Sequence, residues 1–276
     1  MWLLAALGTT FCFGINNSIF KWSATRGLSK ISIQFFFYMV ASLLITGYGL
    51  YRHQFHFSGW AVLLGAAAGI LNANGNIQMT KAFEKGPAGI TSTLIAMNAI
   101  IPVLASGILF PEPIPPLHWL GVILMVMAAA IVQFQPNRNN QVEYRTWLVR
   151  IALALLSIGS CAVILKITAF YQISFANYLL FFYSGGFVYL ALRMMKQEIH
   201  LIEVKVGSMV GILSVIGFGC YLYALASGPA SVVFPVISLN CLVVMGTGLL
   251  LFNEKIRWYQ AIGILVALSG LVLTKI

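Results

Sequence analysis

The sequence predicts an all-α integral membrane protein in which ten transmembrane helices form two inverted five-helix repeats. Three observations support this: an apolar composition, ten apolar runs of membrane-spanning length, and an internal repeat. Hydrophobic residues occupy 60% of the 276 positions, charged residues only 8%, and the mean hydropathy is +0.93. A soluble domain carries about a quarter charged residues, so most of this surface is expected to face lipid.

The predicted spans follow from the need for about 20 mostly apolar residues to cross a bilayer. They are 2–22, 31–51, 60–84, 86–110, 116–134, 147–167, 175–195, 207–227, 228–252 and 258–275. The opening MWLLAAL lacks a basic segment before it and is expected to be a retained span. The polar stretch PNRNNQVEYR marks a linker at 135–146 between repeats at 1–134 and 147–276.

The internal repeat is clearest in the fourth and ninth spans. The segment from Gly86 reads GPAGITSTLIAMNAII, and the segment from Gly228, about 142 residues later, reads GPASVVFPVISLNCLV. This offset also pairs Asn98 with Asn240. Because each repeat has an odd number of spans, the second enters the membrane from the opposite side, which makes the repeats inverted.

Basic residues set the expected orientation. The formal charge is +10, but Lys and Arg occur singly near the ends of apolar runs, so they indicate topology and no nucleic-acid partner is expected. One side of the membrane holds only Arg52, Lys166 and Lys275, and the other holds Lys21, Arg26, Lys30, Lys81, Lys85, Arg138, Arg145, Arg150, Arg193, Lys196, Lys205, Lys255 and Arg257. Positive charge favours the cytoplasmic side, so both termini are predicted to lie outside.

The helix opened by GPA, its central Asn, the closing LFxE and the Gly-rich helix after it resemble the paired signature of the drug/metabolite transporter superfamily, specifically its EamA-like ten-helix transporters. The resemblance covers essentially the whole chain. It implies a carrier or exporter of amino acids or other small metabolites, with a cavity between the halves and with spans 116–134 and 258–275 at the periphery. Two features depart from the family: its termini are often cytoplasmic, and its arginine cluster before the third span is reduced here to Arg52, His53 and His56.

Amide side chains are the first candidates for the substrate site, because polar groups inside lipid are costly. Asn72 and Asn76 share one face of the third span, and an amide can bind a carboxylate, an ammonium or a hydroxyl group. Asn98, Asn240 and Asn17 are further candidates. For each, the alternative is an interhelical hydrogen bond worth about 0.6 kcal/mol. The stretch that matches the third span, 214–221, is far less polar, so an asymmetric cavity is expected.

Three tyrosines are candidates with a second interpretation. Tyr38 and Tyr183 each end an identical Phe-Phe-Tyr in the second and seventh spans, and Tyr221 lies in the eighth. Aromatic side chains in membranes usually pack or anchor at the interface. A hydroxyl-bearing gate or a stacking wall for a substrate is the alternative.

Four charged residues are candidates for gating or electrostatic roles. Lys21 and Lys166 end the first and sixth spans at matching positions, where they either extend to the interface or attract anionic groups. Glu112 and Glu254 precede the fifth and tenth spans, where an acid caps a helix start or latches a gate.

Together these features predict a secondary active or facilitative transporter of a small polar metabolite, such as an amino acid or similar zwitterion, that works by alternating access. The alternative is a lipid-linked substrate flippase or a multidrug exporter of the same fold. The expected partners are a small-molecule substrate and the lipid bilayer, for a monomer or homodimer in a bacterial inner (plasma) membrane. No enzymatic activity, cofactor or metal is expected, because the four His lie near loops or span ends and the four Cys lie singly within apolar segments.

The orientation can be tested with a reporter fused to the C-terminus. The Lys and Arg distribution predicts activity of a periplasmic reporter such as alkaline phosphatase. A cytoplasmic signal, from green fluorescent protein fused at the same position, would overturn the predicted topology.

Overall fold

The computed structural model describes residues 1–52, 58–109, 115–133, 144–171, 173–195, 197–228, 233, 236–237, 239–253 and 257–273. Within these ranges all regular secondary structure is helical. The elements are α1 (Trp2–Thr25), α2 (Lys30–Arg52), α3 (Gly59–Lys85), α4 (Ala88–Ala96), η1 (Met97–Ala99), α5 (Ile100–Leu109), α6 (Pro116–Gln133), α7 (Tyr144–Phe170), α8 (Phe175–Met194), α9 (Leu201–Ser227), α11 (Asn240–Leu251) and α12 (Trp258–Leu273). The all-α prediction is confirmed.

Among the residues that the structure describes, five helices, α1, α2, α7, α8 and α9, are long and apolar enough to cross a membrane by length and composition. The predicted fourth span, 86–110, differs from expectation because it is not one helix. It is divided into α4 and α5 by the short 3-10 helix η1. Pro102 explains the position of the break, since it lacks the N–H that would bond the Asn98 carbonyl and its ring crowds that carbonyl.

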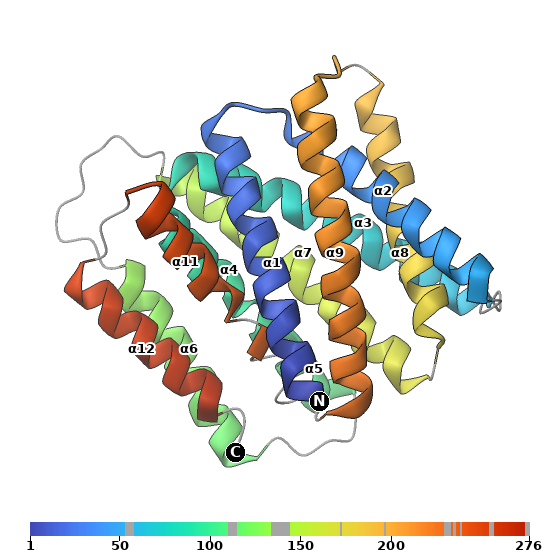
Figure 1. The fold of residues 1–276 in the computed structure, drawn as a ribbon. Coiled ribbons are helices and arrows are strands. Elements are labelled where there is room, and N and C mark those ends of the chain that lie inside the picture. Colours follow the sequence, from blue (N-terminus) through green and yellow to red (C-terminus); the bar gives the residue numbers. More distant parts are fainter. Residues whose placement is uncertain are drawn as a thin grey trace.

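The two repeats run in opposite directions and interlock (Figure 1). Helix α1 starts at the lower end of the view and α7 at the upper end, and the pairs α2/α8 and α3/α9 are reversed in the same way. Helix α1 packs along α9, and its counterpart α7 packs along α3. Helices α6 and α12 pair with each other at one edge, as the family resemblance implies for the fifth and tenth spans.

Glycines permit the closest contacts between the repeats. A Cβ built on Gly69 of α3 would lie 1.9 Å from the carbonyl oxygen of Phe182 in α8. In the reciprocal contact, a Cβ on Gly211 of α9 would lie 2.8 Å from the carbonyl oxygen of Phe37 in α2. Such small-residue positions let helix backbones approach in a membrane, where dispersion contacts replace the hydrophobic effect.

The first glycines of the two GPA motifs lie against tryptophans from the opposite repeat. A Cβ on Gly86 would lie 2.3 Å from Nε1 of Trp147, the indole near the start of α7. A Cβ on Gly228 would lie 2.7 Å from the ring of Trp2, near the start of α1. The glycine of each GPA motif therefore makes room for the first tryptophan of the other half.

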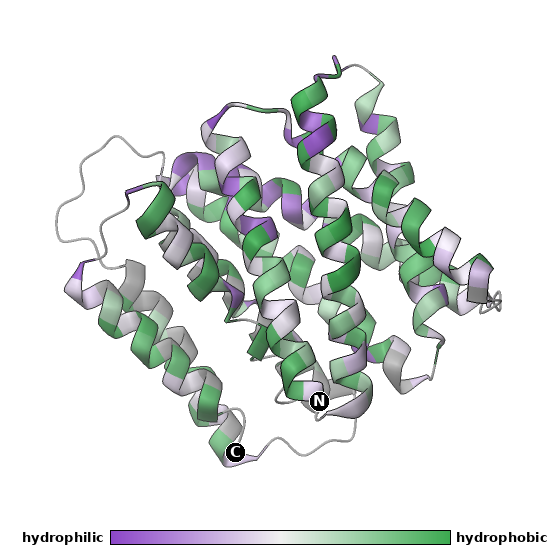
Figure 2. Cartoon of the chain, viewed as in Figure 1, coloured by the Kyte–Doolittle hydropathy of each residue, from purple (hydrophilic) through white to green (hydrophobic). Residues whose placement is uncertain are grey.

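Charged groups gather at the end of the bundle where α1 and α3 finish and α7 and α9 begin, seen as purple ribbon at the upper end of Figure 2. We call this the basic end, defined by Arg26, Lys30, Lys81, Lys85, Arg145, Arg150, Arg193 and Lys205. Lys30 forms a 2.5 Å ion pair with Glu84. Glu203 is buried at the start of α9 and accepts a 2.8 Å hydrogen bond from the backbone N–H of Ser29, which ties α9 to the α1–α2 turn.

Substitution of Gly69 by Ala should destabilise the bundle by about 1–3 kcal/mol, because the added methyl group overpacks a backbone contact. Gly219→Ala is the matched control: a Cβ at this α9 position meets nothing within 4 Å, and removing a helical glycine should gain about 0.5–1 kcal/mol. Thermal unfolding in detergent, followed by size-exclusion chromatography, would compare the two. Equal stability of both variants would contradict the assigned α3–α8 contact.

Candidate functional site

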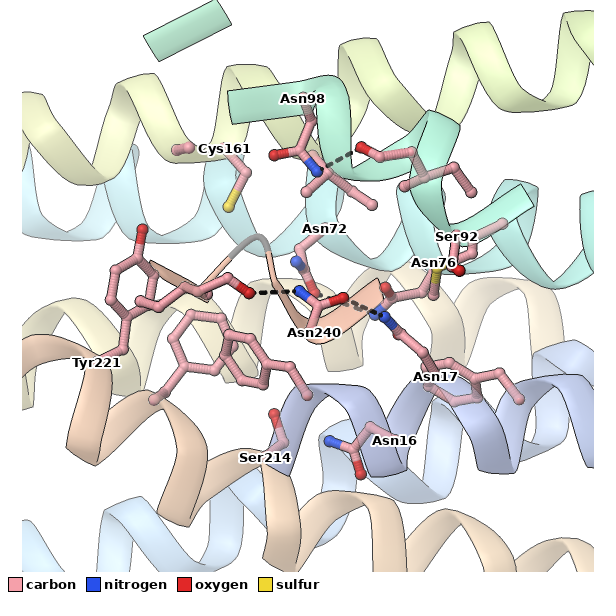
Figure 3. A pocket seen from close by; sticks show the side chains of 18 of the residues that line it. Asn16, Asn17, Asn72, Asn76, Ser92, Asn98, Cys161, Ser214, Tyr221 and Asn240 are labelled. Carbon is pink, nitrogen blue, oxygen red and sulfur yellow. Dashed lines mark hydrogen bonds between the residues drawn. The ribbon is translucent and has the colours of Figure 1, made fainter. Parts of the chain in front are cut away.

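A cavity of about 150 Å³ lies between the repeats (Figure 3). Its described lining comes from α1, α2, α3, α4, η1, α5, α7, α9 and α11 and from Ile237, and α6, α8 and α12 contribute none of it. Six amides line it: Asn16, Asn17, Asn72, Asn76, Asn98 and Asn240. The other polar side chains are those of Ser92, Cys161, Ser214 and Tyr221, and none of the lining residues that the structure describes carries a formal charge.

Residues at matching positions of the two repeats line the cavity, but most of these pairs differ in side-chain chemistry. The 142-residue offset pairs Asn72 with Ser214 and Asn76 with Phe218, and all four side chains line the cavity. On α1 and α7 the offset is 145, as for Lys21 and Lys166, and it pairs Asn16 and Asn17 with Cys161 and Ala162, which also line the cavity. Only Asn98 and Asn240 keep an amide in both halves, so the structure has the asymmetry that the third and eighth spans predict.

The α3 amides belong to a hydrogen-bonded chain. Tyr38 Oη donates to Asn72 Oδ1 at 2.7 Å, and Asn76 Nδ2 donates to the same oxygen at 3.1 Å. Asn76 Nδ2 also donates to Gln34 Oε1 at 3.4 Å. Gln34 is 1% exposed, and its Nε2 has no protein partner among the described residues, as is also true of Asn16 Oδ1. A buried orphan atom costs about 1–3 kcal/mol, so this network is not optimised for stability alone.

Asn98 and Asn240 make the same local bond at two helix breaks. Each Nδ2 donates at 2.8 Å to the carbonyl three residues earlier, that of Ile95 or of Ile237. Asn240 Oδ1 also accepts from Asn17 Nδ2 at 3.3 Å, which joins α11 to α1. Each amide thus bonds a carbonyl beside a helix break, and at Ile95 it adds to a bond from a backbone N–H. Interrupted helices at a repeat interface are typical of substrate sites in inverted-repeat transporters.

The three tyrosine candidates have different positions. Tyr221 lines the cavity. Tyr38 and Tyr183 are fully buried and lie behind lining residues: Tyr38 bonds Asn72, and the Tyr183 hydroxyl lies 3.1 Å from that of Ser214. Because Asn72 and Ser214 correspond in the repeat, both halves contain a tyrosine that supports the same lining position.

Of the charged candidates, Lys21 has the clearest structural role. It is only 7% exposed, so it does not extend to the surface as the interface interpretation requires. Its Nζ donates to the carbonyls of Phe83, at 3.1 Å, and Gly86, at 3.0 Å, and therefore ties α1 to the α3–α4 turn. Lys166 is half-buried near the end of α7. Glu112 and Glu254 fall outside the described residues, so their predicted roles stay predictions.

Several lining residues were missed by sequence reasoning. Phe13, Phe20 and Phe218 form much of the apolar wall, and Ser92 adds a hydroxyl. Nothing distinguishes these phenylalanines from the many others in apolar spans. Gln34, which supports Asn76 from α2, did carry a signal, since it is a lone amide in an otherwise apolar run.

The two helix-break asparagines allow a matched stability comparison. Asn240→Ala should destabilise the protein more than Asn98→Ala, because the first loses two side-chain hydrogen bonds and the second loses one. The difference should be about 0.5–1.5 kcal/mol, the net value of one hydrogen bond. A double-mutant cycle should couple Asn17→Ala with Asn240→Ala and not with Asn98→Ala. Additivity in both cycles would exclude the α1–α11 bond.

Comparisons with known proteins agree with this architecture. The chain resembles a protein of known crystal structure whose title, "Crystal structure of protein", gives no function. The TM-score is 0.69 at 15% sequence identity, and the match covers 97% of this chain and 95% of the other. At that identity the likeness concerns the fold alone. No curated protein gives a significant match. The sequence pattern of the EamA-like transporter family matches residues 1–134 and again 145–276. The chain is therefore an integral membrane protein that belongs to the EamA-like transporter family.

Proposed function

We propose that this protein is a secondary active or facilitative transporter of a small polar metabolite, working by alternating access. The observation that carries the proposal is the uncharged, amide-lined cavity at the interface of two inverted repeats. Rocking of one repeat against the other can expose such a site to each side of the membrane in turn.

The lining favours a zwitterion with an apolar side chain, such as an amino acid. Amides offer both donors and acceptors, so they can bind a carboxylate and an ammonium group together. The absence of charged side chains among the described lining residues disfavours a solute with a large net charge. Phe13, Phe218 and Tyr221 supply aromatic surface for the apolar part of the solute.

The contacts between helices differ at the two ends of the cavity, and this difference supports alternating access. At the basic end Lys21 bonds the α3–α4 turn, and the hydroxyls of Ser18 in α1 and Thr247 in α11 lie 2.7 Å apart. Helix α1 packs against α3, whereas their counterparts α7 and α9 are barely in contact within the described residues. We infer that the cavity is closed at the basic end in this state. In a bacterial plasma membrane this end would face the cytoplasm, because Lys and Arg are enriched on the cytoplasmic side.

The cavity volume favours this proposal over a flippase or multidrug exporter of the same fold. A cavity of about 150 Å³ is the size that holds a benzene-like molecule. A lipid-linked sugar or a bulky drug would require a much larger space or an opening to the lipid.

Counterflow in proteoliposomes tests the function. Vesicles loaded with one solute should accumulate its labelled form when the protein carries it, and the panel should include amino acids, sugars, nucleosides and polyamines. We expect accumulation of neutral amino acids. Movement of head-group-labelled lipid without movement of any of these solutes would establish the flippase instead.

Asn72→Leu tests the site within the same assay. It removes a cavity-lining amide, and loss of a hydrogen bond to a charged group, about 1.5–3 kcal/mol, should raise KM about tenfold or more. Asn74→Leu is the control, because Asn74 is on α3 but outside the cavity, where it bonds Ser157 Oγ at 3.2 Å. If folded Asn72→Leu protein transports like the Asn74→Leu protein, the Asn72 amide does not bind the solute.

A further inference from the structure

We propose that Tyr38 is a positioning residue that sets the direction of the Asn72 amide, so that the cavity presents an N–H donor to the carboxylate of the substrate. This inference rests on the proposed function and deepens it. It assigns the two polar groups of a zwitterion to separate parts of the cavity wall.

The direction of the Asn72 amide follows from its hydrogen bonds. Its Oδ1 accepts two of them, from Tyr38 Oη at 2.7 Å and from Asn76 Nδ2 at 3.1 Å. The Nδ2 atom donates to no described residue and belongs to a side chain that lines the cavity. Since amide oxygen and nitrogen point away from each other, fixing the oxygen on Tyr38 leaves Nδ2 for a ligand.

Tyr38 can hold this direction because it is sealed from competing partners. Its side chain is 0% exposed and packs beside Phe37, Phe182 and Tyr183. A tyrosine hydroxyl buried among aromatic rings needs an acceptor, since an unpaired hydroxyl in such surroundings is costly. Asn72 Oδ1 is that acceptor, and reversal of the amide would deprive Tyr38 of it.

Asn98 leaves its amide oxygen for a ligand, whereas Asn72 leaves its amide N–H group. Its Nδ2 is used by the Ile95 carbonyl at 2.8 Å, so its Oδ1, which accepts from no described residue, is left to the cavity. Asn240 cannot serve in the same way, because its Nδ2 bonds Ile237 and its Oδ1 accepts from Asn17. The wall thus offers a donor at Asn72 and an acceptor at Asn98, which match a carboxylate and an ammonium group respectively.

The second repeat provides an internal control. Tyr183 supports Ser214 as Tyr38 supports Asn72, with 3.1 Å between the hydroxyls. A serine hydroxyl rotates and can both donate and accept, so Tyr183 imposes no direction on the group that faces the cavity. Removal of the Tyr183 hydroxyl should leave any preference between carboxylate and amine unchanged.

The test uses three probes of one shape in wild-type and variant proteoliposomes. L-leucine carries both charged groups, 3-methylbutylamine lacks the carboxylate, and 4-methylpentanoate lacks the amine. Labelled leucine counterflow gives KM, and inhibition of it by the other two compounds gives their relative affinities. The ratio of these two inhibition constants is the readout, because a general packing defect would weaken both compounds alike.

Asn72→Asp keeps the oxygen that Tyr38 and Asn76 bond but replaces the cavity-facing N–H group by an acceptor. It should weaken leucine and 4-methylpentanoate about tenfold or more, the value of a lost charge-assisted hydrogen bond, while 3-methylbutylamine is retained or bound more tightly. Tyr38→Phe keeps the ring packing and frees the amide to turn. It should shift the amine-to-carboxylate ratio several-fold toward the amine, roughly what one neutral hydrogen bond is worth.

Each outcome decides the inference. An unchanged ratio in folded Tyr38→Phe protein, or an equal shift in Tyr183→Phe, would overturn the positioning role while the proposed function stands. Retained carboxylate binding in Asn72→Asp would show that this amide presents its oxygen, which is the opposite direction. Wild-type protein that transports members of the solute panel but not leucine would overturn the assigned zwitterion, and failure of the whole panel would overturn the proposed function itself.

Discussion

The structure depends on one constraint: inside a bilayer, a polar group has no water to bond and must find a partner within the protein. This constraint accounts for the side chain of Asn98 at the helix break, which bonds the Ile95 carbonyl at 2.8 Å. It also explains Lys21, whose ammonium group reaches the carbonyls of Phe83 and Gly86 where α3 ends. Among the described residues, four buried side-chain atoms lack a hydrogen-bond partner, and two of them, Gln34 Nε2 and Asn16 Oδ1, lie in or directly behind the cavity wall. The other two, Tyr178 Oη and Glu203 Oε2, belong to residues outside the lining.

The same constraint couples the site to the packing of the repeats. Because the hydrophobic effect does not hold helices together in lipid, the bundle relies on close backbone contacts. Gly69 and Gly211 supply them reciprocally, each against the second helix of the other repeat. Those second helices, α2 and α8, also carry Tyr38 and Tyr183, which bond lining residues on α3 and α9. A change in the packing of the repeats would therefore also move the groups that hold the cavity wall.

Much of this organisation could be predicted from the sequence. The apolar runs predict the helices, and the four-residue spacing of Asn72 and Asn76 places both on one face. Whether a side chain lies in the cavity or behind it depends on helix rotation, which no local pattern specifies. For that reason the sequence makes Tyr38 and Tyr221 equally good candidates for the site, whereas in the structure Tyr221 lines the cavity and Tyr38 does not. The contacts of Lys21 join residues more than sixty positions apart and depend on tertiary packing.

Inversion places the chemical difference between the repeats at opposite ends of the cavity. From the centre of the cavity, α3 continues toward the basic end and α9 toward the opposite end, because the two helices run in opposite directions. Asn76 therefore lies nearer the basic end than Asn72, and Tyr221 lies toward the other end. Figure 3 shows Asn76 and Tyr221 on opposite sides of Asn72. For the zwitterion proposed above, this arrangement favours binding with the charged groups toward the basic end and the apolar tail toward Tyr221. Divergence between the duplicated halves thus gives the two ends of a symmetric scaffold different chemistry.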